Sequence, residues 1–214
     1  MRALQRTTSD QANKTTMNTK KKNVGIFIFD DAEVLDFAGP FEVFSVTAQL
    51  NDHKPFNVFT IAKTKENISA VNGLKVLPDY SIKDHPPIDL LIVAGGQGTR
   101  IIMKDAQILA WIRRIYEESE LTLSICSASR IFGALGELDG KNYSTHQDVY
   151  DHMSEIAPKA NPQKDNRYTR TSDKLFTSGG ISAGIDLSFH VVANLLGKNT
   201  ARKTAQYMEY ALVE

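Results

Sequence analysis

Apolar and polar positions along the chain alternate between short apolar runs and longer stretches with helical spacing. Residues 23–29, 56–62, 89–94 and 121–125 are the short runs, and they are rich in β-branched and aromatic side chains. The run at 89–94 is almost continuously apolar, as in a parallel strand covered on both faces. Strands that alternate with helical stretches predict a mostly parallel sheet with helices on both faces.

Four stretches carry the helical spacing. The first contains Phe41, Phe44 and Ala48, and we expect this helix to begin after the Gly39-Pro40 pair. The second has apolar residues at Ile108, Leu109, Ile112, Ile115 and Tyr116. The last two span about residues 182–196 and 200–212.

One β-hairpin is expected outside the main sheet. Asn72-Gly73 separates two short runs, and both of these residues tolerate the positive φ that a tight hairpin turn requires.

Length and composition favour a single domain. The 214 residues, 42% hydrophobic and 23% charged, suffice for one sizeable core, which we place in residues 23–214. Residues 1–22 hold few large apolar side chains, so we expect a flexible tail there. A transit peptide is the weaker alternative, because the segment lacks an amphipathic pattern.

Charge and cysteine content restrict the partners. Lys plus Arg and Asp plus Glu number 25 each, so no net field attracts nucleic acid or an anionic membrane. No apolar run reaches the roughly 18 residues that a membrane span needs. With one cysteine the chain forms no internal disulfide. We expect a cytoplasmic protein that binds a small molecule or a second copy of itself.

Cys126 is the residue with the clearest chemical potential. It follows the run at 121–125 and precedes small residues that open a helical pattern. Such a strand-to-helix turn stands at the carboxyl edge of an open sheet, where ligands bind. The N-terminus of the next helix favours a thiolate, so we expect a lowered thiol pKa and a nucleophilic role. The alternative is a buried, inert cysteine.

Two other segments are expected at the same edge. Gly95 and Gly96 follow the strand at 89–94, and their unobstructed N–H groups suit an oxyanion hole; an ordinary glycine turn is the alternative. Glu33 and Asp36 lie in the expected loop after the first strand, where a carboxyl can exchange a proton with the cysteine. The alternative for Asp36 is to cap the next helix.

The histidines give weaker indications. His146 is a candidate for orienting groups near the thiol, although a lone histidine is more often structural. Asp148 and His152 stand four positions apart on an expected helix, but two ligands without a third do not predict a metal site. We expect neither a metal nor another cofactor.

Together these segments resemble the DJ-1/PfpI superfamily, which is class I glutamine amidotransferase-like, and within it the isonitrile hydratase-like branch. The likeness runs from about Asn23 to Tyr210. The stretches that carry it are 29–40, 93–98, 124–129 with its continuation to Thr145-His146, and 177–187. The resemblance implies a flavodoxin-like three-layer α/β sandwich, usually a homodimer, with Cys126 as nucleophile and Asp36 beside it.

Three positions depart from the pattern of this branch. Ser127 stands where threonine is usual, Ala128 where glycine is usual, and Gln147 where a tryptophan commonly follows the Thr-His pair. These changes affect the expected pocket, so the substrate does not follow from the resemblance.

The resemblance implies hydration of an isonitrile to an N-substituted formamide through a thioimidate on Cys126, with Asp36 as acid and then base. The substrate-binding and oxyanion residues are then Ser127, Gly95, Gly96 and His146. Glyoxalase-like or deglycase-like carbonyl chemistry is one alternative. The other is a non-catalytic ligand- or oxidant-sensing domain, as in regulators that join this fold to a helix-turn-helix module. No such module is seen up to Glu214, so we expect no nucleic-acid partner.

Overall fold

A seven-stranded sheet organises residues 21–212, the part of the chain that the computed structural model describes. The strand order is β10-β11-β7-β6-β1-β2-β5, and neighbouring strands are parallel except for β10 and β11. The tail expected over residues 1–22 lies, apart from its last two positions, outside the described residues.

The four strands expected at the centre of the sheet are confirmed. The strands of the sheet are β1 (Lys22–Phe27), β2 (Phe56–Ala62), β5 (Tyr80–Ser81), β6 (Leu90–Val93), β7 (Leu121–Ser124), β10 (Tyr168–Arg170) and β11 (Leu175–Ser178). Phe27, Val93 and Ser124 are neighbours in register, so the carboxyl ends of β1, β6 and β7 meet at one edge. All four residues of β6 are buried, which explains its unbroken apolar sequence.

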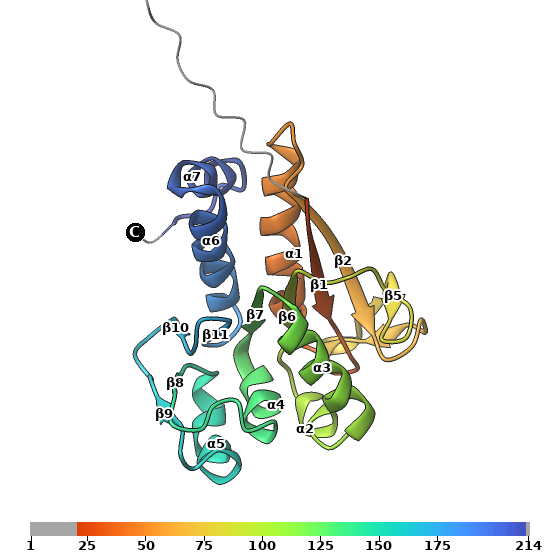
Figure 1. Ribbon diagram of the computed structural model, residues 1–214, viewed down its shortest axis with the longest axis vertical. Coiled ribbons are helices and arrows are strands. Elements are labelled where there is room, and N and C mark those ends of the chain that lie inside the picture. Colours follow the sequence, from red (N-terminus) through yellow and green to blue (C-terminus); the bar gives the residue numbers. More distant parts are fainter. Residues whose placement is uncertain (1–20, 213–214) are drawn as a thin grey trace, which may run out of the picture.

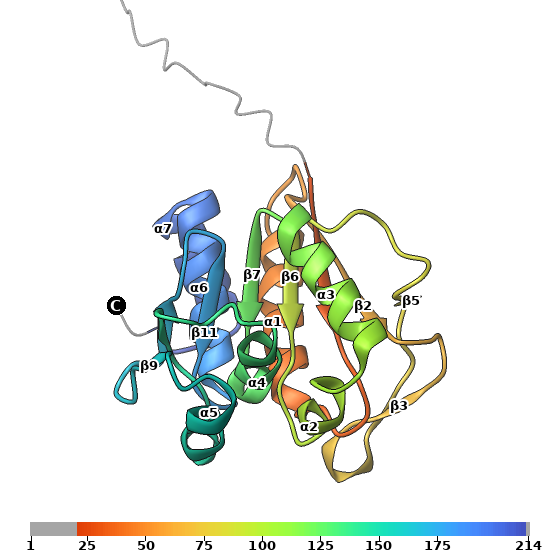
Figure 2. The same cartoon turned by 60° about the horizontal axis from the view of Figure 1, so that its bottom comes forward.

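Helices cover both faces of the sheet. α1 (Val34–Gln49) and α6 (Ala183–Leu196) lie side by side on one face with α7 (Lys198–Tyr207), and α3 (Ala106–Glu118) covers the other face (Figures 1 and 2). The short helices α2 (Thr99–Ile102), α4 (Ser129–Ala134) and α5 (Tyr150–Ile156) gather where the strands end (Figure 2). The mostly parallel sheet with helices on both faces, which the residue pattern predicts, is therefore confirmed, and it is the flavodoxin-like α/β sandwich that the resemblance implies.

α3 shows how the local sequence produces such a helix. The Asp105 side chain accepts hydrogen bonds from the N–H groups of Gln107 and Ile108, which the first turn leaves without helical partners. The buried residues Ile108, Trp111, Ile112 and Ile115 follow at helical spacing and pack on the sheet.

α1 begins earlier than the sequence suggested. Its first residue is Val34, so Gly39 and Pro40 lie inside the helix rather than before it. Pro40 lacks only the N–H group that would bond the Asp36 carbonyl, one hydrogen bond in a helix held by burial. A Cβ atom on Gly39 would lie 2.7 Å from Cγ1 of Ile185, so the glycine allows the close approach of α1 and α6. The consequence for the site is that Asp36 belongs to the first helical turn, not to a loop.

α7 also ends earlier than expected, at Tyr207. Glu209 has a φ of 51°, outside the helical region, and turns the chain back. Tyr210 then stacks on Phe189 of α6 and donates a 2.7 Å hydrogen bond to Asp186 Oδ1.

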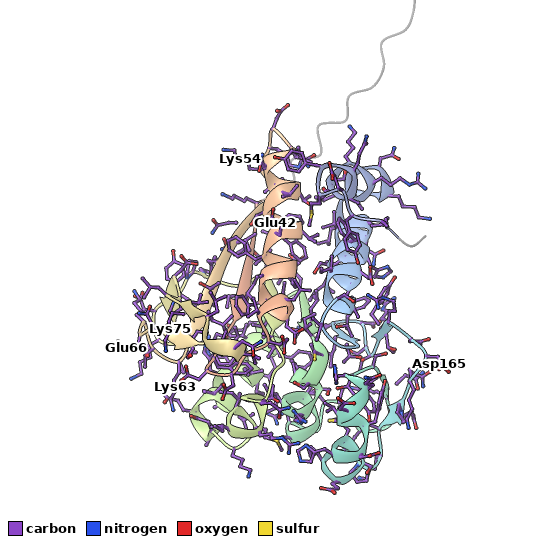
Figure 3. All side chains as sticks on the ribbon, turned by 180° about the vertical axis from the view of Figure 1, so that it is seen from behind. Glu42, Lys54, Lys63, Glu66, Lys75 and Asp165 are labelled. Carbon is purple, nitrogen blue, oxygen red and sulfur yellow. The ribbon has the colours of Figure 1, made fainter. Side chains whose placement is uncertain are left out.

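Two small strand pairs lie outside the main sheet. The expected hairpin is confirmed: β3 (Ile68–Ser69) pairs antiparallel with β4 (Lys75–Val76), and Asn72 and Gly73 both have positive φ. β8 (Asn142–Tyr143) pairs in parallel with β9 (Asn161–Pro162). Figure 3 shows Asp165, on the loop after β9, at the opposite side of the molecule from Lys63, Glu66 and Lys75 around the hairpin. Within residues 21–212, no helix is long and apolar enough to cross a membrane.

Candidate active site

Cys126 occupies a strained turn between β7 and α4. Its φ of 55° lies in the left-handed region, which a non-glycine residue adopts only where the surrounding structure enforces it. The Thr145 hydroxyl holds this turn by donating a 3.0 Å hydrogen bond to the Cys126 carbonyl. The cysteine side chain is nearly covered, with 5% of the residue exposed. The expected placement at a strand-to-helix turn is therefore confirmed.

Asp36 lies fully buried beside the thiol. The Gly95 N–H group donates a 3.0 Å hydrogen bond to its Oδ2. Oδ1 has no hydrogen-bond partner of ordinary geometry among the described residues, although the carboxyl is close enough to Cys126 for each group to shift the pKa of the other. Glu33, the other carboxyl considered, precedes α1 and makes no side-chain cap.

The glycine turn after β6 is occupied by side chains of the site. The Gly95 N–H group is bonded to Asp36, and the Gly96 N–H group donates a 2.8 Å hydrogen bond to Ser127 Oγ. The Ser127 hydroxyl in turn donates to the Gly96 carbonyl at 3.0 Å. Both amides thus hold the groups on either side of the thiol in place.

The amides that face the sulfur belong to Ser127 and Ile181. Burial and, after it, the Asp36 charge raise the pKa of the Cys126 thiol to about 12, against hydrogen bonds from the backbones of Ile181 and Ser127. The lowered thiol pKa that the sequence suggested is therefore wrong, because burial and a neighbouring carboxylate outweigh the end of the short helix α4. Ile181 was not expected in the site, and its φ of 52° is seen only in the structure. In the sequence, the preceding Gly179-Gly180 pair is the one hint of an unusual turn there.

The pKa of the Asp36 carboxyl is also raised, to about 7. Burial is the main cause and the charge of Glu33 adds to it, while hydrogen bonds from Cys126 and Gly95 oppose it. Two adjacent acids that both resist ionisation titrate as one unit. Near neutral pH, Cys126 and Asp36 together carry at most one negative charge, and a proton can pass between sulfur and carboxyl.

His146 lies over the loop before α6 rather than beside the thiol. Its Nδ1 accepts a hydrogen bond from the Asp148 N–H group, and its ring packs against Gly180. A pocket of about 460 Å³ opens beside it, and its wall includes Thr145, Gln147 and Ile181. The pocket thus includes in its wall the residue whose amide faces Cys126. Gln147 lines it, as expected for the position where a tryptophan is usual.

Among the described residues, no group of three or more His, Cys, Asp or Glu side chains is placed to hold a metal ion. Asp148 lies in a 3-10 turn, η3 (Gln147–Val149), before α5, and His152 lies within α5. His152 accepts a hydrogen bond from Arg130 instead of facing a second ligand.

The fold and site define a flavodoxin-like α/β protein with a cysteine and a carboxyl at the carboxyl edge of its sheet. The chain belongs to the DJ-1/PfpI family, whose sequence pattern matches residues 22–194. It is 32% identical over 188 residues to a Pseudomonas putida protein named isonitrile hydratase, covering 88% of this chain and 78% of that protein.

Two further relatives extend the comparison. A THiJ/PfpI family protein from Pseudomonas syringae has a similar solved structure, with a TM-score of 0.80, 22% identity, and coverage of 97% of this chain and 84% of that one. The transcriptional regulator GbdR of Pseudomonas aeruginosa is 21% identical over 90% of this chain. The chain spans about half, 52%, of that regulator's length.

Proposed function

We propose that the protein hydrates an isonitrile, R–NC, to the N-substituted formamide, R–NH–CHO, with Cys126 as nucleophile and Asp36 as its proton-transfer partner. The observation that carries the proposal is the buried Cys126–Asp36 pair. When this pair carries one negative charge, its remaining proton can lie on either the sulfur or the carboxyl. The 32% identity to a protein named isonitrile hydratase supports this reaction among those open to a cysteine–carboxyl pair.

The first half of the reaction needs a nucleophile and an acid at once. The terminal isonitrile carbon accepts an electron pair from sulfur, and that same carbon takes a proton. When the pair's proton lies on Asp36, the thiolate attacks while the carboxyl delivers the proton, giving the thioimidate R–N=CH–S–Cys126. The N–H groups of Ser127 and Ile181 stabilise the negative charge on the thiolate before the attack.

The second half reverses the role of the carboxyl. Asp36, now ionised, takes a proton from water as the water oxygen adds to the thioimidate carbon. Asp36 passes this proton to the nitrogen and then takes the proton of the new hydroxyl as the carbon–sulfur bond breaks. The formamide leaves, and the Cys126–Asp36 pair again holds one proton. Water is the only co-reactant. Because the Gly95 and Gly96 amides bond Asp36 and Ser127, they act in this scheme by fixing those side chains.

The pocket whose wall includes Ile181 is the proposed binding site for the substrate side chain R. Gln147 and His146 form part of its wall, so polar groups face R instead of the indole that is usual in the branch. We place R there and the reacting carbon beside Cys126.

The test is formamide production from cyclohexyl isonitrile, followed by NMR with purified protein. Cys126→Ala is the matched control, because alanine fits the same turn without the nucleophile. Turnover that disappears in the control supports the proposal. Folded protein that yields no formamide from this or a more polar isonitrile rejects it, and methylglyoxal consumption by the same sample would support carbonyl chemistry instead. The homodimer that the resemblance implies stays a prediction, to be measured by light scattering on the same sample.

A further inference from the structure

Arg130 is a buried cation without an acidic partner. It lies in α4, four residues after Cys126, with only 2% of the residue exposed. Its Nε donates to His152 Nδ1 and its Nη1 donates to Thr99 Oγ1, both at 3.0 Å. Both acceptors are uncharged, and no carboxylate forms an ion pair with Arg130 among residues 21–212. A guanidinium taken out of water in this way is unfavourable unless a negative charge lies within reach.

A chain of hydrogen bonds fixes Arg130 relative to the thiol. The Thr99 hydroxyl accepts a hydrogen bond from Arg130 and donates one of 2.7 Å to the Gly96 carbonyl. That carbonyl also accepts from the Ser127 hydroxyl, whose oxygen is bonded by the Gly96 N–H group. The guanidinium therefore has a defined place one helical turn from Cys126, coupled to the residue that follows it.

The charged groups around Arg130 do not neutralise it. Arg100, at α2, adds a positive charge, and Lys104 adds another near His152. His152 accepts through Nδ1 and is therefore uncharged; burial, Arg100 and Arg130 lower its pKa. Glu155 is the acid on that side, and it is exposed on α5.

The negative charge that acts on Arg130 is that of the Cys126 thiolate. Burial lowers the pKa of Arg130, Arg100 lowers it further, and the charge of Cys126 opposes both effects. Asp36 interacts with Cys126, and Glu33 is the other acid at the start of α1 that acts on Asp36. One buried positive charge thus acts on a pair that carries at most one negative charge.

We propose that Arg130 is the counter-charge of the Cys126–Asp36 pair: without touching substrate, it stabilises the negative charge on the pair and so sets the pH at which the thiol becomes reactive. This positioning role deepens the proposed function, since it rests on Cys126 as the nucleophile. It does not depend on which substrate the thiol attacks.

The test is the pH dependence of Cys126 alkylation by iodoacetamide around neutral pH, where the Cys126–Asp36 pair takes up its first negative charge. Because the chain has one cysteine, the reagent reports this site alone. Arg130→Gln, or Arg130→Met if the glutamine variant does not fold, should raise the midpoint of the profile by about one pH unit, which lowers reactivity about tenfold below the midpoint. Arg130→Lys keeps the charge and should stay within a few tenths of a unit of the wild type.

Two controls separate charge from geometry. Arg100→Gln removes an exposed cation of the same cluster and should shift the midpoint far less, because solvent screens it. Thr99→Val breaks the hydrogen-bond chain while keeping the guanidinium, and should leave the midpoint in place.

Three outcomes overturn the counter-charge: an unchanged midpoint in a folded neutral variant, a shift in Arg130→Lys as large as in Arg130→Gln, or an equal shift in Thr99→Val. If neither neutral variant folds, a shift of a full pH unit in Arg130→Lys, which keeps the charge, overturns the proposal by itself. If the protein makes no formamide but the variants show the expected shifts, the proposed isonitrile hydration is rejected and the counter-charge role of Arg130 is supported.

Discussion

The Gly95 N–H group and Asp36 Oδ2 are 3.0 Å apart, and this hydrogen bond ties the glycine turn after β6 to the carboxyl beside the thiol. A Cβ atom on Gly95 would lie 2.7 Å from that oxygen, 2.7 Å from the Ser127 nitrogen and 2.8 Å from the Ile125 carbonyl oxygen. Two of these three neighbours are backbone atoms, which cannot rotate away. Gly95 is therefore needed because of the close approach of three segments of chain.

Gly95→Ala should reduce kcat/KM by about 10² or more, because even a small displacement of Asp36 misplaces the proton-transfer partner. The same crowding should destabilise the fold by about 1–3 kcal/mol. Gly136→Ala is the matched control: its φ of 78° makes alanine strained, but nothing lies within 4 Å of the new Cβ. It should lose about 1 kcal/mol in urea denaturation and keep its turnover. Equal turnover in the two variants would contradict the role of Gly95.

Asp36→Asn should lose activity and gain stability at the same time. Removing a positioned acid-base group typically lowers turnover by about 10² to 10⁴. The folded protein holds the pKa of Asp36 at about 7, against an ordinary value of 3.8, so the folded state binds the proton more tightly and stability falls as pH rises from about 4 to 7. At 1.36 kcal/mol for each pH unit between the two values, wild type loses about 4 kcal/mol over this window.

Urea denaturation at pH 4.5 and pH 8 checks this sign. The asparagine variant should be the more stable protein at pH 8, and the difference should narrow at pH 4.5, where wild-type Asp36 is largely protonated. A variant that is less stable than wild type at pH 8 would show that the Asp36 charge is compensated in the folded state.

The central sheet could be predicted because its strands are buried on both faces and read as apolar runs. The limits of α1 could not, because Gly39 and Pro40 are helix breakers in isolation. Only the contact of Gly39 with Ile185, more than 140 positions away, explains why a glycine belongs there. β5 and β8–β10 are two or three residues long and held by their neighbours, so they leave little pattern in the sequence.

For the site, strand ends predicted which segments meet but not which atoms face the sulfur. Cys126, Asp36, Gly95, Gly96 and Ser127 are brought together by the carboxyl ends of β6 and β7 and the start of α1. The thiol pKa is raised rather than lowered as expected, because the burial of Cys126 depends on the tertiary structure and cannot be read from the local sequence. Ile181 contributes its backbone N–H, and a backbone group is invisible to reasoning from side-chain types.

Ser127→Ala and Ser127→Thr should differ. Alanine removes the acceptor for the Gly96 N–H group and the donor for the Gly96 carbonyl, and the loss of such a buried pair is worth about 1–3 kcal/mol. We expect about a tenfold fall in kcat for Ser127→Ala. Threonine keeps the hydroxyl, so its kcat should stay within about threefold of wild type. Equal losses in both variants would assign the effect to packing rather than to the hydroxyl.

Gly180→Ala should act on substrate binding through His146. The new Cβ would lie 2.1 Å from His146 Cδ2, so the imidazole at the pocket wall must move. KM should rise severalfold, with kcat changed much less because Cys126 and Asp36 are not displaced. Gly179→Ala is the neighbouring control, since its Cβ meets no atom closer than 3.5 Å and should leave KM unchanged. A fall in kcat at constant KM would place His146 in the chemistry instead.

Peroxide oxidation of Cys126 separates the proposed enzyme from an oxidant sensor. The thiol is 5% exposed, and burial together with the Asp36 charge raises its pKa to about 12, so the thiolate is the minor form at neutral pH. Oxidation to a sulfenic acid requires an accessible thiolate. We therefore expect hydrogen peroxide to oxidise Cys126 more slowly than free cysteine at pH 7.4, as followed by dimedone labelling and mass spectrometry. Cys126→Ala gives the background signal. Labelling faster than that of free cysteine, with no isonitrile hydrated, would identify the site as a redox sensor. The negative charge shared with Asp36 would then maintain a thiolate that peroxide can oxidise.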